Sequence, residues 1–199
     1  MTSIHPMDCD STLITLDTKH IELLDSLIEK AQNSHGKAKI EFEHQFFCAI
    51  PNSNDGMLDL LYVDEVNSRE TDKLPPIDNG IHRFISFYSK LESIELNQYY
   101  NKYINMCVDG FYGADYNKNG FQIYERLETD TKTICAILLQ RNETDIKSVF
   151  RFIFDSSHPE NELNQEIYDN IYPLIYAENE QLGYLFKTCL EDLIKQKRH

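Results

Sequence analysis

The chain has 199 residues, and its 41% hydrophobic and 12% aromatic content is enough to bury a sizeable core, which excludes a disordered protein. Its 33 acidic residues outnumber the 19 basic residues, so the net charge is -14. A field of this sign repels nucleic-acid phosphates and anionic membrane surfaces and attracts cationic partners, which excludes direct nucleic-acid binding.

The first third of the chain predicts a flexible arm, a helix and a hairpin. The arm covers residues 1–16, and Asp17 and Thr18 then begin a helix that ends near Ser34. Its apolar positions recur at helical spacing, at Ile21, Leu24, Leu27, Ile28 and Ala31. Residues 39–50 and 57–63 are predicted strands, because residues 51–56 between them have the Pro, Asn, Asp and Gly content of a strong turn.

The middle of the chain predicts a loop, a broken helix and three strands. Residues 64–77 are polar and contain two consecutive prolines, which indicates a loop. A helical stretch follows as far as Cys107, with a break near Ser93. Its expected core positions are Ile81, Phe84, Ile85, Tyr88, Leu91, Leu96, Tyr99, Tyr100, Tyr103, Ile104 and Cys107. The three strands are expected at residues 121–127, 133–140 and 148–154, with turn-like residues between them.

The C-terminal quarter predicts two helices. Ser157 and Glu160 have the spacing of a capping box, and Pro173 is expected to end the first helix. That helix is expected to bury Leu163, Ile167 and Ile171. The last helix is expected to bury one face, made by Leu182, Leu185, Phe186, Cys189, Leu190 and Leu193.

The predicted order is therefore αββα(α)βββαα, which indicates the α+β class. Strands joined by short turns pair antiparallel, so we expect a mainly antiparallel sheet of about five strands packed against helices. Residues 17–199 are expected to form a single domain, with the C-terminal helical pair at about residues 157–197.

The cysteine pattern and the N-terminus predict a cytoplasmic protein. The cysteines lie far apart and include no C-x-x-C pair, so we expect all of them to be reduced and unpaired. They are Cys9, Cys48, Cys107, Cys135 and Cys189. The N-terminus has neither the basic nor the apolar segment of a signal peptide. The longest apolar run, residues 134–139, is too short to cross a membrane, so no membrane association is expected.

The search for catalytic and cofactor-binding motifs predicts no active site or cofactor site. Asp115, Asn117 and Asn119 have the spacing that opens a calcium-binding EF-hand loop, but Arg126 occupies the position of the bidentate glutamate. We therefore expect a tight turn that feeds a strand and does not bind calcium. His44 and Cys48 would share one face of a predicted strand, but no third group orients them as a nucleophile pair. No catalytic residue, metal or cofactor is predicted.

The distribution of charge predicts a binding surface. Residues 152–186 contain seven acidic residues and no Lys or Arg, with tyrosines interleaved among them. Residues 55–72 are a second acidic segment. Acids without compensating bases repel one another, and tyrosine is enriched at protein interfaces. We therefore expect these two segments to form one face that binds a basic partner, through Glu162, Glu166, Asp169, Tyr168, Tyr172, Asp59, Asp64 and Glu65.

This profile predicts a non-enzymatic binding protein. It is similar to that of proteins that neutralise a cationic partner, such as bacterial immunity proteins for nuclease-type toxins and phage anti-defence inhibitors. The mechanism would be occlusion of a basic site on a toxin or nucleic-acid-acting enzyme, with electrostatic steering of the encounter. Two alternatives remain: a small enzyme whose active site is assembled from distant residues, and a structural or adaptor subunit, including a homodimer through the last helix.

Overall fold

The structure is a computed structural model that describes residues 9, 15–70, 77–78, 81–108, 123–154 and 159–197. It divides into two compact units, Met1–Tyr99 and Tyr100–His199. A compact unit need not fold on its own, so the single domain over residues 17–199 stays a prediction.

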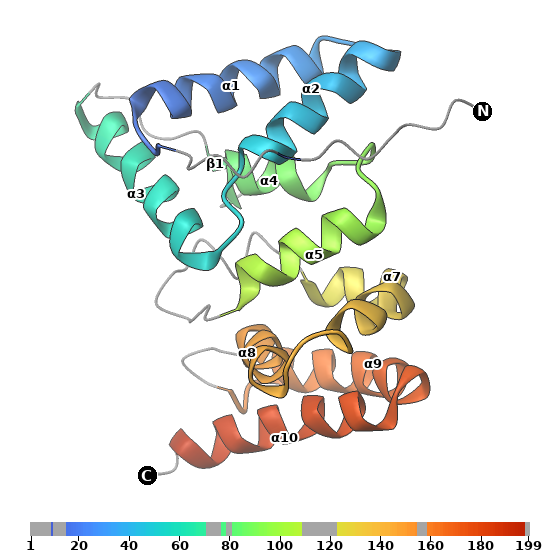
Figure 1. Cartoon of the computed structure of the whole chain (residues 1–199). Coiled ribbons are helices and arrows are strands. Elements are labelled where there is room, and N and C mark those ends of the chain that lie inside the picture. Colours follow the sequence, from blue (N-terminus) through green and yellow to red (C-terminus); the bar gives the residue numbers. More distant parts are fainter. Residues whose placement is uncertain are drawn as a thin grey trace. The chain divides into compact units, whose positions relative to one another are not determined.

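The described residues are almost entirely helical, so the α+β prediction is wrong and the fold class is all-α (Figure 1). The first unit contains α1 (Thr18–Gln32), α2 (Gly36–Ala49), α3 (Asn54–Glu70) and α4 (Arg83–Ser89), and α5 (Leu96–Cys107) contains the boundary between the units. The second unit contains α7 (Ile123–Leu138), α8 (Glu143–Phe154), α9 (Glu162–Glu178) and α10 (Glu180–Lys197). Among the described residues, the only sheet pairs β1 (Ile77–Asp78) antiparallel with β2 (Ile81–His82).

The predicted hairpin is two helices. Residues 39–49 belong to α2, which buries Glu43, His44, Phe46 and Phe47 at helical spacing, and Ile50 follows its end. The expected turn at residues 51–56 contains the start of α3 instead. Ser53 caps that helix, since its Oγ accepts a hydrogen bond from the Gly56 N–H at 3.1 Å. Ser, Asn and Asp satisfy backbone groups at helix starts as well as in turns, so the polar segment did not distinguish the two.

The three later strands are also helical over most of their described residues, and residues 139–140 form a turn. Residues 123–127 and 133–138 lie in α7, and residues 148–154 lie in α8. The expected turn before the last strand is the start of α8, because Asn142 Oδ1 accepts from the Asp145 N–H at 2.9 Å. Short apolar runs satisfy a buried strand and a buried helix equally well, and helix packing decided between them here.

The helices with regular apolar spacing are confirmed. In α1, the Asp17 side chain accepts from the His20 N–H at 3.0 Å, and Ile21, Leu24, Leu27 and Ala31 are buried. The break near Ser93 separates α4 from α5. The predicted face of α10 is also confirmed, with Cys189 only half-buried. Leu96, expected in the core, is instead largely exposed at the start of α5.

The penultimate helix differs from its prediction at both ends. It begins at Glu162, because the side chain of Asn161 accepts from the Asn164 N–H at 2.7 Å. It continues through Pro173, which lies on the exposed side, where the surrounding water can satisfy the freed carbonyl. Leu163 is 50% exposed, and the buried position is the neighbouring Asn164, whose Nδ2 donates to the carbonyl of Phe154 at 2.8 Å.

Helix pairs bury the core within each unit. In the first unit, α1 packs against α2 and α3, as Figure 1 shows for the blue and teal helices. In the second unit, α9 packs against α7 and α10, and α10 also packs against α8. No helix of the described residues is long and apolar enough to cross a membrane.

Candidate functional site

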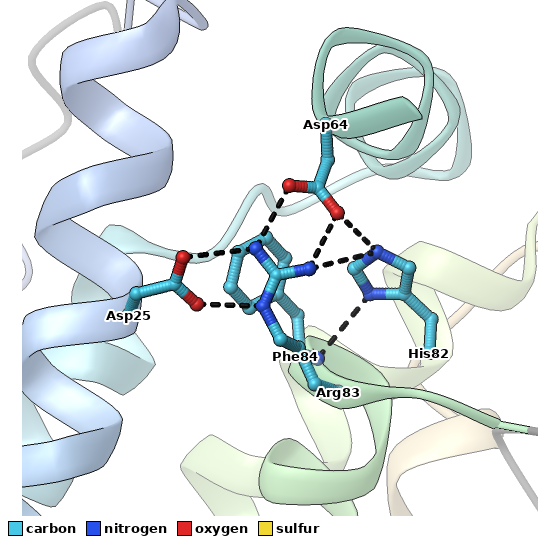
Figure 2. Close-up of polar contacts among 5 residues, drawn as sticks. All are labelled: Asp25, Asp64, His82, Arg83 and Phe84. Carbon is cyan, nitrogen blue, oxygen red and sulfur yellow. Dashed lines mark hydrogen bonds and ion pairs between the residues drawn. The ribbon is translucent and has the colours of Figure 1, made fainter. Parts of the chain in front are cut away.

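A polar cluster in the first unit joins α1, α3, β2 and α4 (Figure 2). The guanidinium of Arg83 is held between two carboxylates. Its Nε and Nη2 donate to Asp25 at 2.6 and 2.9 Å, and its Nη1 and Nη2 donate to Asp64 at 2.5 and 2.8 Å. The guanidinium carbon also lies 4.2 Å from the centroid of the Phe84 ring. Bidentate pairs of this kind are strong and directional, so Arg83 fixes α1 and α3 to the start of α4.

His82 completes the cluster and uses both of its ring nitrogens. Nδ1 lies 3.3 Å from the Phe84 N–H, which only donates, so Nδ1 is the acceptor and the ring proton is on Nε2. Nε2 then donates to Asp64 at 2.8 Å. A general base needs a ring nitrogen available to the substrate proton. His82 therefore caps α4, and the His82–Asp64 pair is structural rather than a catalytic dyad.

Asp64 is ionised because the cluster stabilises its charge. Burial alone would raise the pKa of Asp64, but the hydrogen bonds and charges of Arg83 and His82 outweigh it and lower the pKa to about 2. Asp64 and Asp25 in turn raise the pKa of Arg83 against the opposite effect of burial. The pair is therefore charged at neutral pH.

This depressed pKa predicts a loss of stability in acid. Above the unfolded-state pKa of about 4, ionised Asp64 contributes about 2 kcal/mol to the free energy of unfolding. As the pH falls from about 4 through 2, the carboxylate is protonated and this contribution is lost. Urea unfolding of the protein and of Asp64→Asn between pH 5 and pH 2.5 should show the difference between them shrinking by about 2 kcal/mol. Asp59→Asn, an exposed acid on the same helix, should show no such change; equal behaviour of the two variants would refute the assignment.

A second candidate is an exposed surface of α9, which we call the α9 face. It consists of Glu162, Glu166, Asp169, Tyr168, Tyr172 and Tyr176. The three acids stand at i, i+4 and i+7 and therefore share one side of the helix. All three are exposed, and none forms an ion pair with a Lys or Arg in the part of the chain that the structure describes. Asp169 accepts a hydrogen bond from Gln165 Nε2 at 2.8 Å.

The tyrosines of the α9 face form a stacked column. The ring centroids of Tyr168 and Tyr172 are 5.1 Å apart with an interplanar angle of 17°, and those of Tyr172 and Tyr176 are 5.6 Å apart. Tyr168 also stacks at 6.2 Å on Phe186 of α10, which is fully buried. The column is therefore anchored in the core and needs little ordering when a partner binds. Burial raises the pKa of Tyr168, so its hydroxyl remains protonated at neutral pH.

The far end of the column is set by a close approach of α10. A Cβ added to Gly183 would lie 2.8 Å from the Cα of Tyr176, so any larger residue would push the two helices apart. Glycine inside a helix is unfavourable by about 1 kcal/mol relative to alanine. The close contact with Tyr176 explains why glycine occupies this helical position. Tyr184, which follows Gly183, is 64% exposed.

The predicted site residues fall into two groups. Glu162, Glu166, Asp169, Tyr168 and Tyr172 lie together on α9. Asp59, Asp64 and Glu65 lie on α3 in the other unit, so the predicted joint face stays a prediction. Asp59 is exposed and Glu65 is half-buried, whereas Asp64 is buried and its carboxylate is bound to Arg83. Asp64 therefore belongs to the polar cluster and not to an exposed surface.

The prediction that all cysteines are unpaired is wrong, because Cys9 and Cys48 form a disulfide. Cys107, Cys135 and Cys189 are free. His44 and Cys48 are not a nucleophile pair: His44 Nε2 lies 3.0 Å from the Ser93 carbonyl oxygen and donates to it, and the sulfur of Cys48 is bonded to Cys9. Residues 39 apart give no local signal of pairing, and only the folding of the chain brings them together.

Metal chemistry has no candidate within the described ranges, where no group of three His, Cys, Asp or Glu side chains could hold an ion. The EF-hand-like residues 115–119 lie outside the described residues. Ile123, just after that segment, begins a helix and not the expected strand.

Comparison of this chain with family models, curated proteins and solved structures finds no match. Sequence reasoning missed Asp25, His82 and Arg83, because ion pairs between residues about 18 or 58 positions apart leave no local pattern. It also missed Phe186 as the anchor of the column, although Tyr168, Tyr172 and Tyr176 at i, i+4 and i+8 did carry a signal.

Proposed function

We propose that this chain is a non-enzymatic binding protein whose α9 face engages a basic protein and neutralises it by covering its active surface. One observation carries the proposal: three exposed carboxylates that have no ion-pair partner among the described residues lie beside a column of tyrosines that is anchored in the core. Other surface acids of the second unit pair with lysines, as Glu143 does with Lys147 and Glu191 with Lys187. The acids of the α9 face are therefore open to an external cation.

The physical roles of the two residue types differ. The carboxylates, with the net charge of -14, attract a basic partner over several ångströms and orient its approach. The tyrosines supply contact area at a low cost in conformational entropy, together with hydroxyls for hydrogen bonds. A toxin or enzyme that acts on nucleic acid has a basic active surface, and this chemistry fits such a surface.

His82, Asp64 and Glu43, three buried groups of the first unit, give no support to an enzymatic alternative. Among the buried groups in the described residues, His82 uses both ring nitrogens and Asp64 is bound to Arg83. The buried Glu43 pairs with Lys39 at 3.2 Å. These groups stabilise the fold, and none is arranged to transfer a proton to a substrate.

A charge reversal tests the proposal. The triple variant Glu162→Lys, Glu166→Lys and Asp169→Lys should bind the basic partner roughly ten- to hundred-fold more slowly at low salt, because steering is lost. Its melting temperature should change little, since exposed charges contribute little to stability. The partner is first isolated by affinity capture with the unaltered protein, identified by mass spectrometry, and purified. Association rates are then measured by stopped-flow fluorescence at several salt concentrations.

A matched control separates the α9 face from net charge. Glu143→Lys, Glu191→Lys and Asp192→Lys change the charge by the same amount in the same unit, but these acids already lie beside Lys147, Lys187 and Lys195. The control should associate several-fold faster than the α9 variant. If both variants slow association equally, or if neither does, the α9 face is not the binding surface.

We propose the cytoplasm as the location of this protein. The sequence predicted the cytoplasm, where thiols keep most cysteines reduced. The Cys9–Cys48 disulfide would be opened there, so location and redox state are tested together. Fractionation of cells, with alkylation of thiols before lysis, reports both at once.

A further inference from the structure

The C-terminal end of α2 carries two different links, one to the first turn of α1 and one to Cys9. His20, in the first turn of α1, donates through Nε2 to the carbonyl of Ala49 at 3.0 Å. The adjacent residue of α2, Cys48, is bonded to Cys9. The disulfide therefore encloses all of α1 and nearly all of α2, which pack against each other. One of the two links is a covalent bond that thiols can break.

Among the cysteines of the described residues, those of the disulfide are the most accessible to a thiol reagent. Cys9 is exposed and Cys48 is half-buried, whereas Cys107 and Cys135 are buried. Burial raises the pKa of both buried thiols, to about 12 for Cys135. Cys189 is half-buried, burial raises its pKa to about 11, and its thiol donates to the Lys147 carbonyl at 3.7 Å. Since the thiolate is the reactive form, these three react slowly.

We propose that the Cys9–Cys48 bond is a redox-sensitive lock on the α1–α2 helical hairpin. Opening requires a thiol reductant of the glutathione class. A reductant thiolate attacks one sulfur, the S–S bond breaks, and the other sulfur leaves as a thiolate that takes up a proton. A second reductant thiolate then attacks the mixed disulfide. In balance, the protein gains two electrons and two protons as two thiols, and two reductant molecules are joined as one disulfide.

The disulfide stabilises the α1–α2 hairpin by restricting its unfolded state. A cross-link across a sequence separation of 39 restricts the unfolded chain and so favours the folded state. The chain-entropy model gives a factor on the order of several hundred in the unfolding equilibrium for a loop of this length. After reduction, α1 keeps its hydrogen bonds from His20 to Ala49 and from Thr18 to Asn67. The hairpin therefore stays folded but opens far more often.

Hydrogen exchange of the full chain in defined glutathione buffers tests this lock. In oxidised glutathione, alkylation and peptide mass spectrometry should find Cys9 joined to Cys48 and the other three thiols free. In reduced glutathione, slow amides of α1 and α2 should exchange up to several-hundred-fold faster. Cys48→Ser should match the reduced protein in both buffers, and Cys189→Ser should behave as the unaltered protein does.

Two results would overturn the proposal. The first is free Cys9 and Cys48 after equilibration with oxidised glutathione. The second is a bond that forms but leaves the exchange of α1 and α2 the same in both buffers. Since neither readout involves a partner, these outcomes do not depend on the function proposed for the α9 face.

Discussion

Arg83→Leu is expected to lower the free energy of unfolding by about 3–5 kcal/mol, the cost typical of removing one partner from a buried ion pair. Asp64 is only 2% exposed and would lose the guanidinium that compensates its buried carboxylate. Urea unfolding at pH 7 measures the change.

Two further variants isolate the cause. Arg83→Leu combined with Asp64→Asn should recover part of the loss, because the orphaned charge is removed. Lys195→Leu, which breaks an exposed pair with Asp192, should change the free energy of unfolding by less than about 1 kcal/mol. A cost for Arg83→Leu as small as that of Lys195→Leu would mean that the polar cluster does not hold the helices together.

Phe186→Ala is expected to cost about 3–5 kcal/mol, because it removes a fully buried ring from the second unit. Phe186 contacts the rings of Phe150 and Phe154, with centroids 5.1 and 4.7 Å away. Its ring also stacks on that of Tyr168. The cavity should therefore also loosen the tyrosine column, and the purified partner should dissociate faster from this variant under conditions where it remains folded.

The matched control is Tyr184→Ala on the same helix. Tyr184 is 64% exposed, so its loss should change the free energy of unfolding by less than about 0.5 kcal/mol. Thermal and urea unfolding of both variants measure the difference. If Phe186→Ala unfolds like Tyr184→Ala, the aromatic column is not anchored through Phe186.

Some helices were predictable because their apolar residues repeat at helical spacing over several turns. In α1, buried residues from Ile21 to Ala31 follow the helical spacing and Asp17 marks the start. The last helix was predictable for the same reason. The acids of the α9 face were also placed correctly on one helix, since i, i+4 and i+7 spacing needs no tertiary information.

Other elements depended on contacts that no local pattern encodes. Phe46 and Phe47 suit a strand or a helix, and Ser53 suits a turn or a cap. Five strands were predicted from such ambiguous runs, and none of them is a strand in the described residues, where nearly all of their positions are helical. The decision came from packing, because a helix satisfies its own backbone and needs only one buried side.

By itself, the sequence determined the charge, the regular helices and the acidic side of α9, because composition and local spacing are sufficient for each. Only the tertiary structure decided that Asp64 is buried against Arg83 and that Cys9 meets Cys48. It also decided that Tyr168 rests on Phe186. Each of these contacts joins residues at least 18 positions apart, and their energies depend on burial and distance, which exist only once the chain has folded.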